Sequence, residues 1–471
     1  MDKAYITTAI PYVNGAPHIG HAMDYCLADV CARYRRLLGN EVRFQVGVDE
    51  HGNKIYQKSR ELGVSVEEYV DGNTKKFRDF ISELNISYTD FIRTTDKDHE
   101  KRCQEIWKKL SNHIYKAKYE GWYCSGCERF ITKKEYDENN GICPDHQKAY
   151  ERLEEENYYF RISDFKDKIR DAIESDEMLI LPEFRKKEVL KLLEDSPDVS
   201  FSRSTEQLTW GVPVPGDDSQ VMYVWIDALS NYITVLGYPD KDISEWWPAL
   251  AQFVGKDILR FHAIIWPAML IGLGLPLPKV LLSHGFITSD GQKMSKSIGN
   301  VVDPMDVIEK HGIDAFRYYF LRHIDTFVDS DFTWEKFNEA YNNELANDLG
   351  NLVQRLATLA DKNNLEFEKE LTFKFDSYYR ELMDRFEFSK AFDYVWEKVQ
   401  DINKKIDEEK PWILAKNNEK EKLEKCLTGL IEELLNVNYI LSPFIPNTIE
   451  KISEIFKDKI IPPNTPLFPK N

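Results

Sequence analysis

The chain has 471 residues, of which 42% are hydrophobic, and this length provides for several cores and three or more modules. Its net charge of −18 argues against a general nucleic-acid-binding protein, although a few placed Lys and Arg side chains can still form a local RNA-binding surface. Four of the seven cysteines are scattered singly, at positions 26, 31, 103 and 426, which favours reduced thiols over a disulfide framework.

The hydropathy pattern predicts neither a signal peptide nor a membrane span. The N-terminal apolar run is short and is interrupted by Pro11 and Asn14. Residues 261–278 carry no charge, but glycines and prolines interrupt them, so we expect a buried helix, a turn and a strand at 279–283. These features predict a cytoplasmic protein with no membrane partner.

The first element is a β-rich run at residues 5–10, followed by a Gly/Pro turn and a helical pattern from residue 19 to 38. His18-Ile19-Gly20-His21 lies at the start of that helix, where free backbone N–H groups and the helix dipole form an anion site. The two imidazoles add donors, and Gly20 leaves room for a flat ring, which suits a nucleotide. Because short motifs match by chance, the motif alone would favour a solvated histidine pair or part of a zinc site over a nucleotide site.

A second strand is predicted at residues 41–48, where hydrophobic residues alternate, and it ends at Asp49. The carboxyl ends of parallel strands line the ligand crevice of an open sheet, so Asp49 is placed to meet a substrate cation such as an α-ammonium group. The alternative is an ordinary turn aspartate. Residues 54–116 predict helices joined by polar loops.

A pair of metal-binding knuckles follows. Cys124 and Cys127 are separated by fifteen residues from a second pair, Cys143 and His146. This spacing is typical of a tetrahedral zinc site, and four protein ligands make a closed, structural site. The surrounding segment, residues 115–202, has the composition of an insertion between two halves of a nucleotide-binding fold.

Two helical stripes of apolar residues come next, and the simplest interpretation of either is a buried core. A histidine within the second stripe and the aromatic residues of both suggest instead a pocket for a flexible thioether. The stripes are Trp225, Ala228, Leu229 and Tyr232, and then Ile258, Phe261, His262 and Trp266.

Residues 293–297, Lys-Met-Ser-Lys-Ser, lie between Gly291 and Gly299. This arrangement predicts a mobile loop whose lysines, Lys293 and Lys296, close over phosphates. From about residue 340 the pattern is all-helical, which predicts an appended bundle. Acidic residues outnumber basic ones there, so RNA recognition by a few specific side chains is expected rather than bulk attraction.

The histidine motif and the lysine loop together resemble the paired HIGH and KMSKS motifs of class I aminoacyl-tRNA synthetases. The sequences of residues 11–15, 223–229 and 255–262 resemble the corresponding segments of the methionyl-tRNA synthetase family, and the similarity continues to residues 466–469. The resemblance implies an α/β fold with a Rossmann-like parallel sheet, split by a zinc-binding connective insertion and followed by an all-α anticodon-binding bundle.

The resemblance also implies roles for individual residues. The methionine-binding set is Ile10, Tyr12, Asp49, Trp225, Ala228, Leu229, Tyr232, Ile258, Phe261, His262 and Trp266. The ATP-binding set is His18, Gly20, His21, Gly255, Asp257 and Lys296, and the catalytic set is His18, His21, Lys293 and Lys296. Asn351, Arg355 and Trp412 match positions that read the CAU anticodon, whereas pattern alone predicts that Trp412 is a core residue.

The implied activity is ATP-dependent formation of methionyl-adenylate and transfer of methionine to tRNA(Met). Expected cofactors are one structural Zn²⁺, held by Cys124, Cys127, Cys143 and His146, and Mg²⁺ with ATP. The expected domains are residues 1–114 and 203–290 for the catalytic halves, 115–202 for the insertion, 291–340 for the lysine loop and stem-contact region, and 341–471 for the anticodon-binding bundle. Because the chain ends without the oligonucleotide-binding domain that dimerises some members, a monomer is expected.

Four other functions compete with this interpretation. A cysteinyl-tRNA synthetase would carry a cysteine before the first motif, and residues 10–17 contain none. The isoleucyl, valyl and leucyl enzymes have an editing insertion larger than residues 115–202. A nucleotidylyltransferase or a non-catalytic tRNA-binding paralogue would lack either the helical bundle or one of the phosphate motifs.

Overall fold

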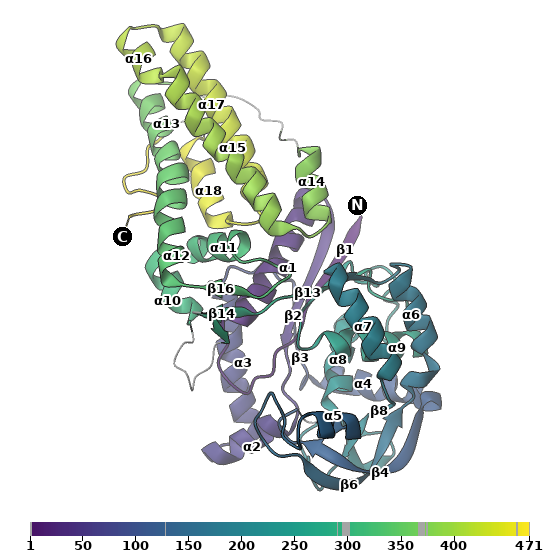
Figure 1. Cartoon of the computed structure of the whole chain (residues 1–471). Coiled ribbons are helices and arrows are strands. Elements are labelled where there is room, and N and C mark those ends of the chain that lie inside the picture. The colour runs from purple at the N-terminus through teal and green to yellow at the C-terminus, as the bar shows by residue number, and fades with distance from the viewer. Residues whose placement is uncertain are drawn as a thin grey trace.

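The centre of the molecule is a parallel sheet of six strands in the order β3-β2-β1-β12-β13-β7 (Figure 1). The computed structural model describes residues 2–127, 129–289, 291–293, 302–365, 373, 375–457 and 460–470. The sheet strands are β1 (Lys3–Thr8), β2 (Glu41–Val48), β3 (Asp90–Arg93), β7 (Leu179–Leu181), β12 (Ala251–Gly255) and β13 (Val280–His284). Every neighbouring pair is parallel, so the predicted Rossmann-like sheet is confirmed.

Helices cover both faces of this sheet, and successive residues of a strand therefore enter different cores. Ile6 packs with α1 (Ile19–Leu37), whereas the adjacent Tyr5 packs in the second core with α4 (Lys97–Lys109) and α8 (Val224–Thr234). The helix predicted after the first strand and the strand predicted at residues 41–48 are both confirmed. The helices α2 (Asn53–Leu62) and α3 (Val66–Glu83) follow β2.

The prediction of helices alone for residues 54–116 is wrong at β3. This four-residue strand pairs with the outer edge of β2, from Gln45 opposite Asp90 to Val48 opposite Arg93. The strand consists of two apolar residues between the charged Asp90 and Arg93. This apolar run is too short to show a strand pattern, although it is sufficient for a strand at the edge of a sheet.

The switch point of the sheet lies between β1 and β12. The chain leaves β1 through α1 and returns at β2 on one side, whereas β12 lies on the other side of β1. In open α/β sheets, ligands bind in the crevice beyond the carboxyl ends of the strands at such a point. The segments that follow β1, β2, β12 and β13 therefore converge there.

Residues 115–202 form most of an antiparallel sheet, the three helices α5, α6 and α7, and one strand of the central sheet. The antiparallel sheet has the order β5-β4-β6-β8 and lies at one end of the molecule (Figure 1). Between α6 (Lys166–Glu174) and α7 (Glu183–Asp195), β7 pairs with β13, so this segment is partly built into the central sheet. The elements are β4 (Ile114–Cys124), β5 (Arg129–Ile131), α5 (Lys133–Glu138), β6 (Glu151–Phe160) and β8 (Val199–Ser200).

Two further small sheets and the remaining helices complete the catalytic region. The sheets are β9 (Ser202–Ser204) with β10 (Pro213–Val214) and β11 (Asp217–Met222), and β14 (Ile287–Ser289) with β15 (Gln292–Lys293) and β16 (Ser330–Phe332). The uncharged stretch forms a π-helical turn, η3 (Phe261–Ile265), then α9 (Trp266–Gly272), and continues toward β13, as predicted. Among the helices that the structure describes, none has the length and apolarity to cross a membrane.

The C-terminal part, from residue 304, is mainly helical, with β16 and the non-helical residues 460–470 as exceptions, and it extends away from the sheet (Figure 1). Its helices are α10 (Pro304–His311), α11 (Ile313–Arg322), α12 (Trp334–Ala340), the π-helical η4 (Tyr341–Gly350), α13 (Asn351–Lys362), α14 (Ser377–Asp384), α15 (Phe388–Glu409), α16 (Pro411–Lys416), α17 (Lys420–Leu441) and α18 (Pro446–Ile455). A fully buried ion pair, Arg317 Nη2 to Asp29 Oδ2 at 2.8 Å, joins α11 to α1. The bundle is therefore fixed to the catalytic sheet through the same helix that begins at the histidine motif.

Candidate active site

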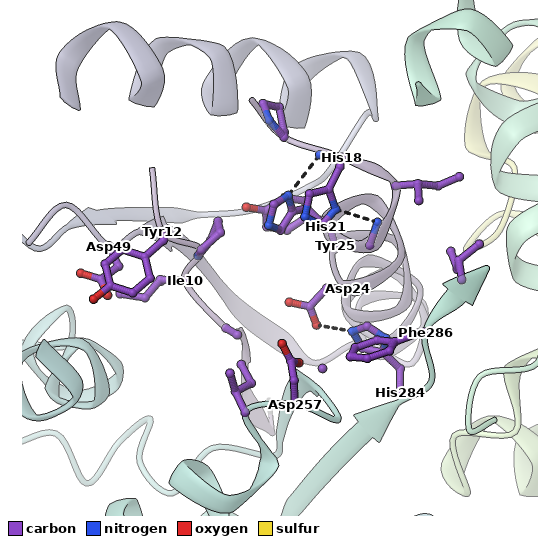
Figure 2. Close-up of a pocket in the computed structure, with 18 of the residues that line it drawn as sticks. Ile10, Tyr12, His18, His21, Asp24, Tyr25, Asp49, Asp257, His284 and Phe286 are labelled. Carbon is purple, nitrogen blue, oxygen red and sulfur yellow. Dashed lines mark hydrogen bonds and ion pairs between the residues drawn. The ribbon is translucent and has the colours of Figure 1, made fainter. Parts of the chain in front are cut away.

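A cavity of about 730 Å³ opens at the carboxyl ends of the parallel strands. Its walls come from the turn after β1, the first two turns of α1, one face of α8, and the segments after β12 and β13. Figure 2 shows Ile10, Tyr12 and Asp49 grouped at one end, and Asp24, Asp257 and His284 grouped apart from them, below the two histidines in this view. The sheet thus brings together residues separated by more than two hundred positions in the sequence.

The two histidines of the motif close the first turn of α1. The backbone N–H of Gly20 donates to His18 Nδ1 at 3.2 Å, and the backbone N–H of His18 donates to His21 Nδ1 at 3.1 Å. The rings are stacked with their centroids 3.7 Å apart. Because each Nδ1 accepts a hydrogen bond, each neutral ring carries its proton on Nε2, the nitrogen that remains as a donor.

His21 is neutral at physiological pH. Burial, and then the neighbouring His18 and His284, hold the pKa of His21 well below its ordinary value. A neutral imidazole donates a hydrogen bond without adding a fixed charge. Any positive charge that balances bound phosphates must therefore come from another group in the site or from an ion bound with the nucleotide.

Most of the residues predicted to bind methionine line the cavity. Those that do are Ile10, Tyr12, Asp49, Trp225, Ala228, Leu229, Tyr232, Ile258 and His262. Phe261 and Trp266 are not among the lining residues. The Phe261 ring stacks on Trp225 with centroids 3.8 Å apart, and Trp266 is fully buried, where its indole N–H donates to Gln252 Oε1. Both support the cavity wall from behind, which a helical stripe cannot reveal.

His262 is the polar group in this apolar wall. Its Nδ1 lies 3.0 Å from the carbonyl oxygen of Ile258, and its Nε2 lies 2.7 Å from the hydroxyl of Tyr232. The carbonyl can only accept, so Nδ1 carries the proton and Nε2 accepts from the tyrosine. Burial lowers the pKa of His262 to about 4, and the ring is a neutral, fixed part of the wall.

Asp49 follows β2, as predicted, and is held against the segment after β1. Its backbone N–H donates to the carbonyl of Pro11 at 2.8 Å, and its carbonyl accepts from the N–H of Val13 at 3.1 Å. Nearby, Gly52 has φ +114°, and a Cβ there would lie 2.7 Å from Tyr12 Oη. Only glycine therefore allows the Tyr12 ring to lie over this turn beside Asp49.

The opposite end of the cavity contains Gly255, Asp257 and a buried pair that sequence reasoning missed. His284 Nε2 lies 3.6 Å from Asp24 Oδ1, and His284 Nδ1 donates to the carbonyl of Gly285 at 2.9 Å. Burial opposes the charged form of His284, but Asp24 outweighs it, and the pKa of His284 is raised. His284 could have been found as Asp49 was, because it directly follows the strand predicted at residues 279–283.

The predicted lysine loop is the part of the site that lies outside the described residues. This holds for Lys296 and for the side chain of Lys293. The loop begins at the cavity, since the chain runs from His284 through β14, and Gly285, Phe286 and Ile287 line the cavity. Val302 and Asp303, which follow the loop in the sequence, also line the cavity.

The four predicted metal ligands lie together at the end of β4. Their ligand atoms are all within 4.8 Å of one another. Cys127 Sγ is 3.6 Å from Cys143 Sγ and 3.5 Å from His146 Nδ1. Sulfur atoms on one tetrahedral zinc ion, each about 2.3 Å from the metal, are about 3.7 Å apart, so this cluster can hold such an ion.

Gly126 gives independent support for the metal-binding cluster. A Cβ on Gly126 would lie 2.3 Å from Cγ of His146, so the imidazole occupies the space that a side chain would need. The second knuckle thus places His146 against the backbone of the first, as a compact ligand cage requires.

The residues predicted to read an anticodon lie at the far end of the helical bundle. Asn351 and Arg355 are one turn apart on α13, and the Arg355 guanidinium lies over the Trp412 ring of α16 at 5.4 Å. Trp412 is 41% exposed, so the prediction from pattern alone that it is a core residue is wrong. The short helix α16 lies at the tip of the bundle (Figure 1).

The chain was then compared with known proteins. The family described as tRNA synthetases class I (M) matches residues 4–154 and 146–357. Two similar proteins, each named methionine–tRNA ligase, come from Caldanaerobacter subterraneus and Brucella suis. The first is 44% identical, covering 96% of this chain and 73% of the relative, and the second is 40% identical, covering 96% and 92%.

Solved structures agree with the sequence comparison. A Mycobacterium tuberculosis methionyl-tRNA synthetase in complex with methionyl-adenylate superposes with a TM-score of 0.91 at 34% identity, covering all of both chains. The same enzyme in its free state gives a TM-score of 0.85 at 32% identity, covering 100% of this chain and 98% of that one. The chain therefore belongs to the class I (M) family of tRNA synthetases.

Proposed function

We propose that the chain is a methionine–tRNA ligase that forms methionyl-adenylate in the cavity between the HIGH motif and α8. The observation that carries the proposal is the arrangement of three kinds of group around one cavity: a carboxylate, an aromatic wall and two imidazole donors. Relatives named methionine–tRNA ligase match nearly the whole chain, and the superposed Mycobacterium enzyme holds methionyl-adenylate. Family, fold and cavity thus support one activity.

The amino-acid end is where Asp49, Tyr12 and α8 meet. The Asp49 carboxylate would accept hydrogen bonds from the α-ammonium group of methionine. The thioether would lie among Trp225, Leu229 and His262, where sulfur–aromatic contacts are favourable. Because His262 donates its proton to a backbone carbonyl, it presents no charge to the apolar side chain.

The nucleotide end is where the histidines, Gly255 and Asp257 lie. A Cβ on Gly255 would lie 2.7 Å from Asp257 Oδ1, so this glycine allows the aspartate to fold back beside the backbone. Asp257 would bind the ribose hydroxyls, and Gly20 would let the adenine lie flat on the start of α1. Mg²⁺ would accompany ATP and would be held mainly by oxygen atoms of the phosphates.

Adenylation then requires positioning and charge stabilisation, and no protein group needs to take a proton. The methionine carboxylate attacks the α-phosphorus in line, and pyrophosphate leaves with the electron pair of the broken bond. Nε2–H of His18 and His21 would donate to phosphate oxygens, and Lys293 and Lys296 would neutralise the charge on the departing pyrophosphate. The aminoacyl group then passes to the terminal adenosine of tRNA(Met).

The remaining assignments concern the metal, tRNA and assembly. Cys124, Cys127, Cys143 and His146 would hold one structural Zn²⁺, and Asn351, Arg355 and Trp412 would contact anticodon bases. The predicted domain limits, with the anticodon-binding bundle at residues 341–471, complete this proposal. A monomeric state and a cytoplasmic location stay predictions, which light scattering and cell fractionation test.

Amino-acid-dependent ATP–pyrophosphate exchange, measured across all twenty amino acids, tests the proposed activity. Methionine should support exchange, and cysteine, isoleucine, valine and leucine should support far less. Exchange with another amino acid in preference to methionine would overturn the proposal, as would exchange with none.

The zinc assignment has a separate test. Metal analysis of purified protein should give one zinc per chain, and Cys127→Ser should lose it, because removing one thiolate opens the closed site. The scattered Cys426→Ser serves as the matched control and should keep the metal. A zinc content unaffected by Cys127→Ser would contradict the assignment.

A further inference from the structure

The helix α8 has two buried faces of opposite character. Trp225, Ala228, Leu229 and Tyr232 line the cavity or its wall, as described above. The other face consists of polar residues that are at most 1% exposed, namely Asp227, Ser230, Asn231 and Thr234. Buried polar groups need partners, so this second face fixes how the first is presented.

Asp227 is the centre of the polar face, and both of its carboxylate oxygens accept a hydrogen bond from histidine. His51 Nδ1 lies 2.6 Å from Oδ2, and His99 Nε2 lies 2.7 Å from Oδ1. All three side chains are nearly inaccessible to solvent. His99 Nδ1 in turn lies 2.7 Å from Thr234 Oγ1, about two turns beyond Asp227 on the same face of α8.

These two histidines come from the parts of the chain that carry the amino-acid end of the cavity. His51 is two residues beyond Asp49, and its backbone N–H approaches Asp49 Oδ1 at 3.4 Å. Glu50, between them, is anchored separately, since its carboxylate accepts from Arg93 Nε at 2.9 and 3.0 Å. His99 belongs to α4, which packs along α8.

The charges of this bridge are complementary. Burial would raise the pKa of Asp227, but His51 and His99 outweigh it and lower that pKa to about 2. Burial likewise opposes the charged form of His51, yet Asp227 outweighs it and raises the pKa of His51. The Asp227 carboxylate is therefore ionised. The other ring nitrogen of His51, Nε2, lies 3.8 Å from Glu100 Oε1.

Hydrogen bonding accounts for this cluster better than metal binding does. His99, Cys103 and Asp227 are close enough together to be considered as ligands. However, ligand atoms about 2 Å from a tetrahedral ion are about 3.3 Å apart, whereas His99 Nε2 and Asp227 Oδ1 are 2.7 Å apart. That separation is the length of a charge-assisted hydrogen bond.

We propose that Asp227, bridged by His51 and His99, is a positioning residue for methionine: it fixes the carboxylate of Asp49 relative to the aromatic wall of α8. The two ends of the amino acid are bound by different chain segments, and the bridge is a direct side-chain link between them, beside the hydrogen bond from Gln45 Nε2 on β2 to Asn231 Oδ1 on α8 at 2.8 Å. This inference rests on the proposed function, since it assumes that methionine occupies this end of the cavity.

Three variants test the bridge through steady-state pyrophosphate exchange, with methionine and ATP varied separately. Asp227→Asn and His51→Leu should each raise KM for methionine roughly tenfold or more, the range expected when a buried charged hydrogen bond loses a partner. KM for ATP should change less than about twofold, because the nucleotide end is held by other segments. His51→Asn keeps a donor at the position of Nδ1 and should restore most of the methionine affinity.

Asp314→Asn is the matched control, because Asp314 is also a buried carboxylate and accepts from the backbone N–H of Thr448, outside the cavity lining. It should leave both KM values unchanged. A merely structural role for Asp227 would lower the melting temperature and the active fraction while KM for methionine stayed constant, and that result would overturn the inference.

Two further outcomes are informative. If Asp227→Asn does not fold, the comparison of His51→Leu with His51→Asn decides, and equal KM values for methionine in those two variants would overturn the inference. Loss of methionine-dependent exchange in the unmodified protein would instead refute the proposed function itself, so the two failures are distinguishable.

Discussion

The cavity and the tip of the helical bundle are built in opposite ways. In the cavity, the polar groups are buried and held from several directions, as His262 is by Tyr232 and Ile258. At the tip, Trp412 and Arg355 are partly exposed, and Arg355 is tied to Asp407 by a surface ion pair at 2.6 Å. The first arrangement suits a reaction that needs fixed geometry, and the second suits a surface that accepts unstacked bases.

The joint between the two regions determines how far they are coupled. The buried Arg317–Asp29 pair connects α11 to α1, about two and a half turns beyond the histidine motif. Arg317 also donates to the carbonyls of Pro443 and Phe444. The joint is rigid but lies away from the cavity lining, so we expect changes at the tip to leave adenylation unaffected.

The largest expected effect is at the cavity. Lys296→Ala should slow methionine-dependent pyrophosphate exchange by roughly 10²-fold or more, as for other removed groups that stabilise a transition state. Binding of methionine, measured by calorimetry, should change little, because the lysine acts on pyrophosphate. The exposed Lys404→Ala is the control, and near-normal exchange in Lys296→Ala would remove this lysine from the mechanism.

At the tip, the expected effect is smaller and appears in a different assay. Trp412→Ala should cost about 1–3 kcal/mol in tRNA charging, the range for a base stacked on an aromatic ring. Pyrophosphate exchange should be unchanged. The exposed Tyr378, on α14, provides a matched control, and Tyr378→Ala should leave charging intact. Equal charging by Trp412→Ala and Tyr378→Ala would refute the anticodon assignment.

The smallest effect concerns pH and the neutral His262. Its folded pKa of about 4 is below its ordinary value of 6.5, so the unfolded chain binds a proton that the folded chain does not between these values. Stability should therefore fall as pH decreases through this window, by on the order of 1–2 kcal/mol from pH 7.5 to pH 5. Urea unfolding of the unmodified protein and of His262→Gln measures this contribution, and identical pH dependence in the two proteins would contradict it.

Features of the fold and of the site could be predicted from the sequence wherever a local pattern has a single interpretation. The strand before Asp49 and the knuckles around Cys127 and His146 are such cases, because period-two hydrophobicity and ligand spacing are short-range signals. The parallel order of the sheet then explains why Asp49 faces the cavity.

The residues that were missed depend on long-range packing. Asp24 and Asp227 read as ordinary helical carboxylates, and only the fold brings them against His284 and His51. Likewise, β7 is three residues long and is recognisable as a strand only through its partner β13. Trp412 was ambiguous for the same reason, since exposure depends on which helices lie beside α16.

A crystal structure of this chain with methionyl-adenylate tests the central claim most directly. The account predicts the α-ammonium group within hydrogen-bonding distance of Asp49, the thioether against Trp225 and His262, and the ribose beside Asp257. Density for the thioether outside the wall of α8, or an ammonium group bound away from Asp49, would contradict it.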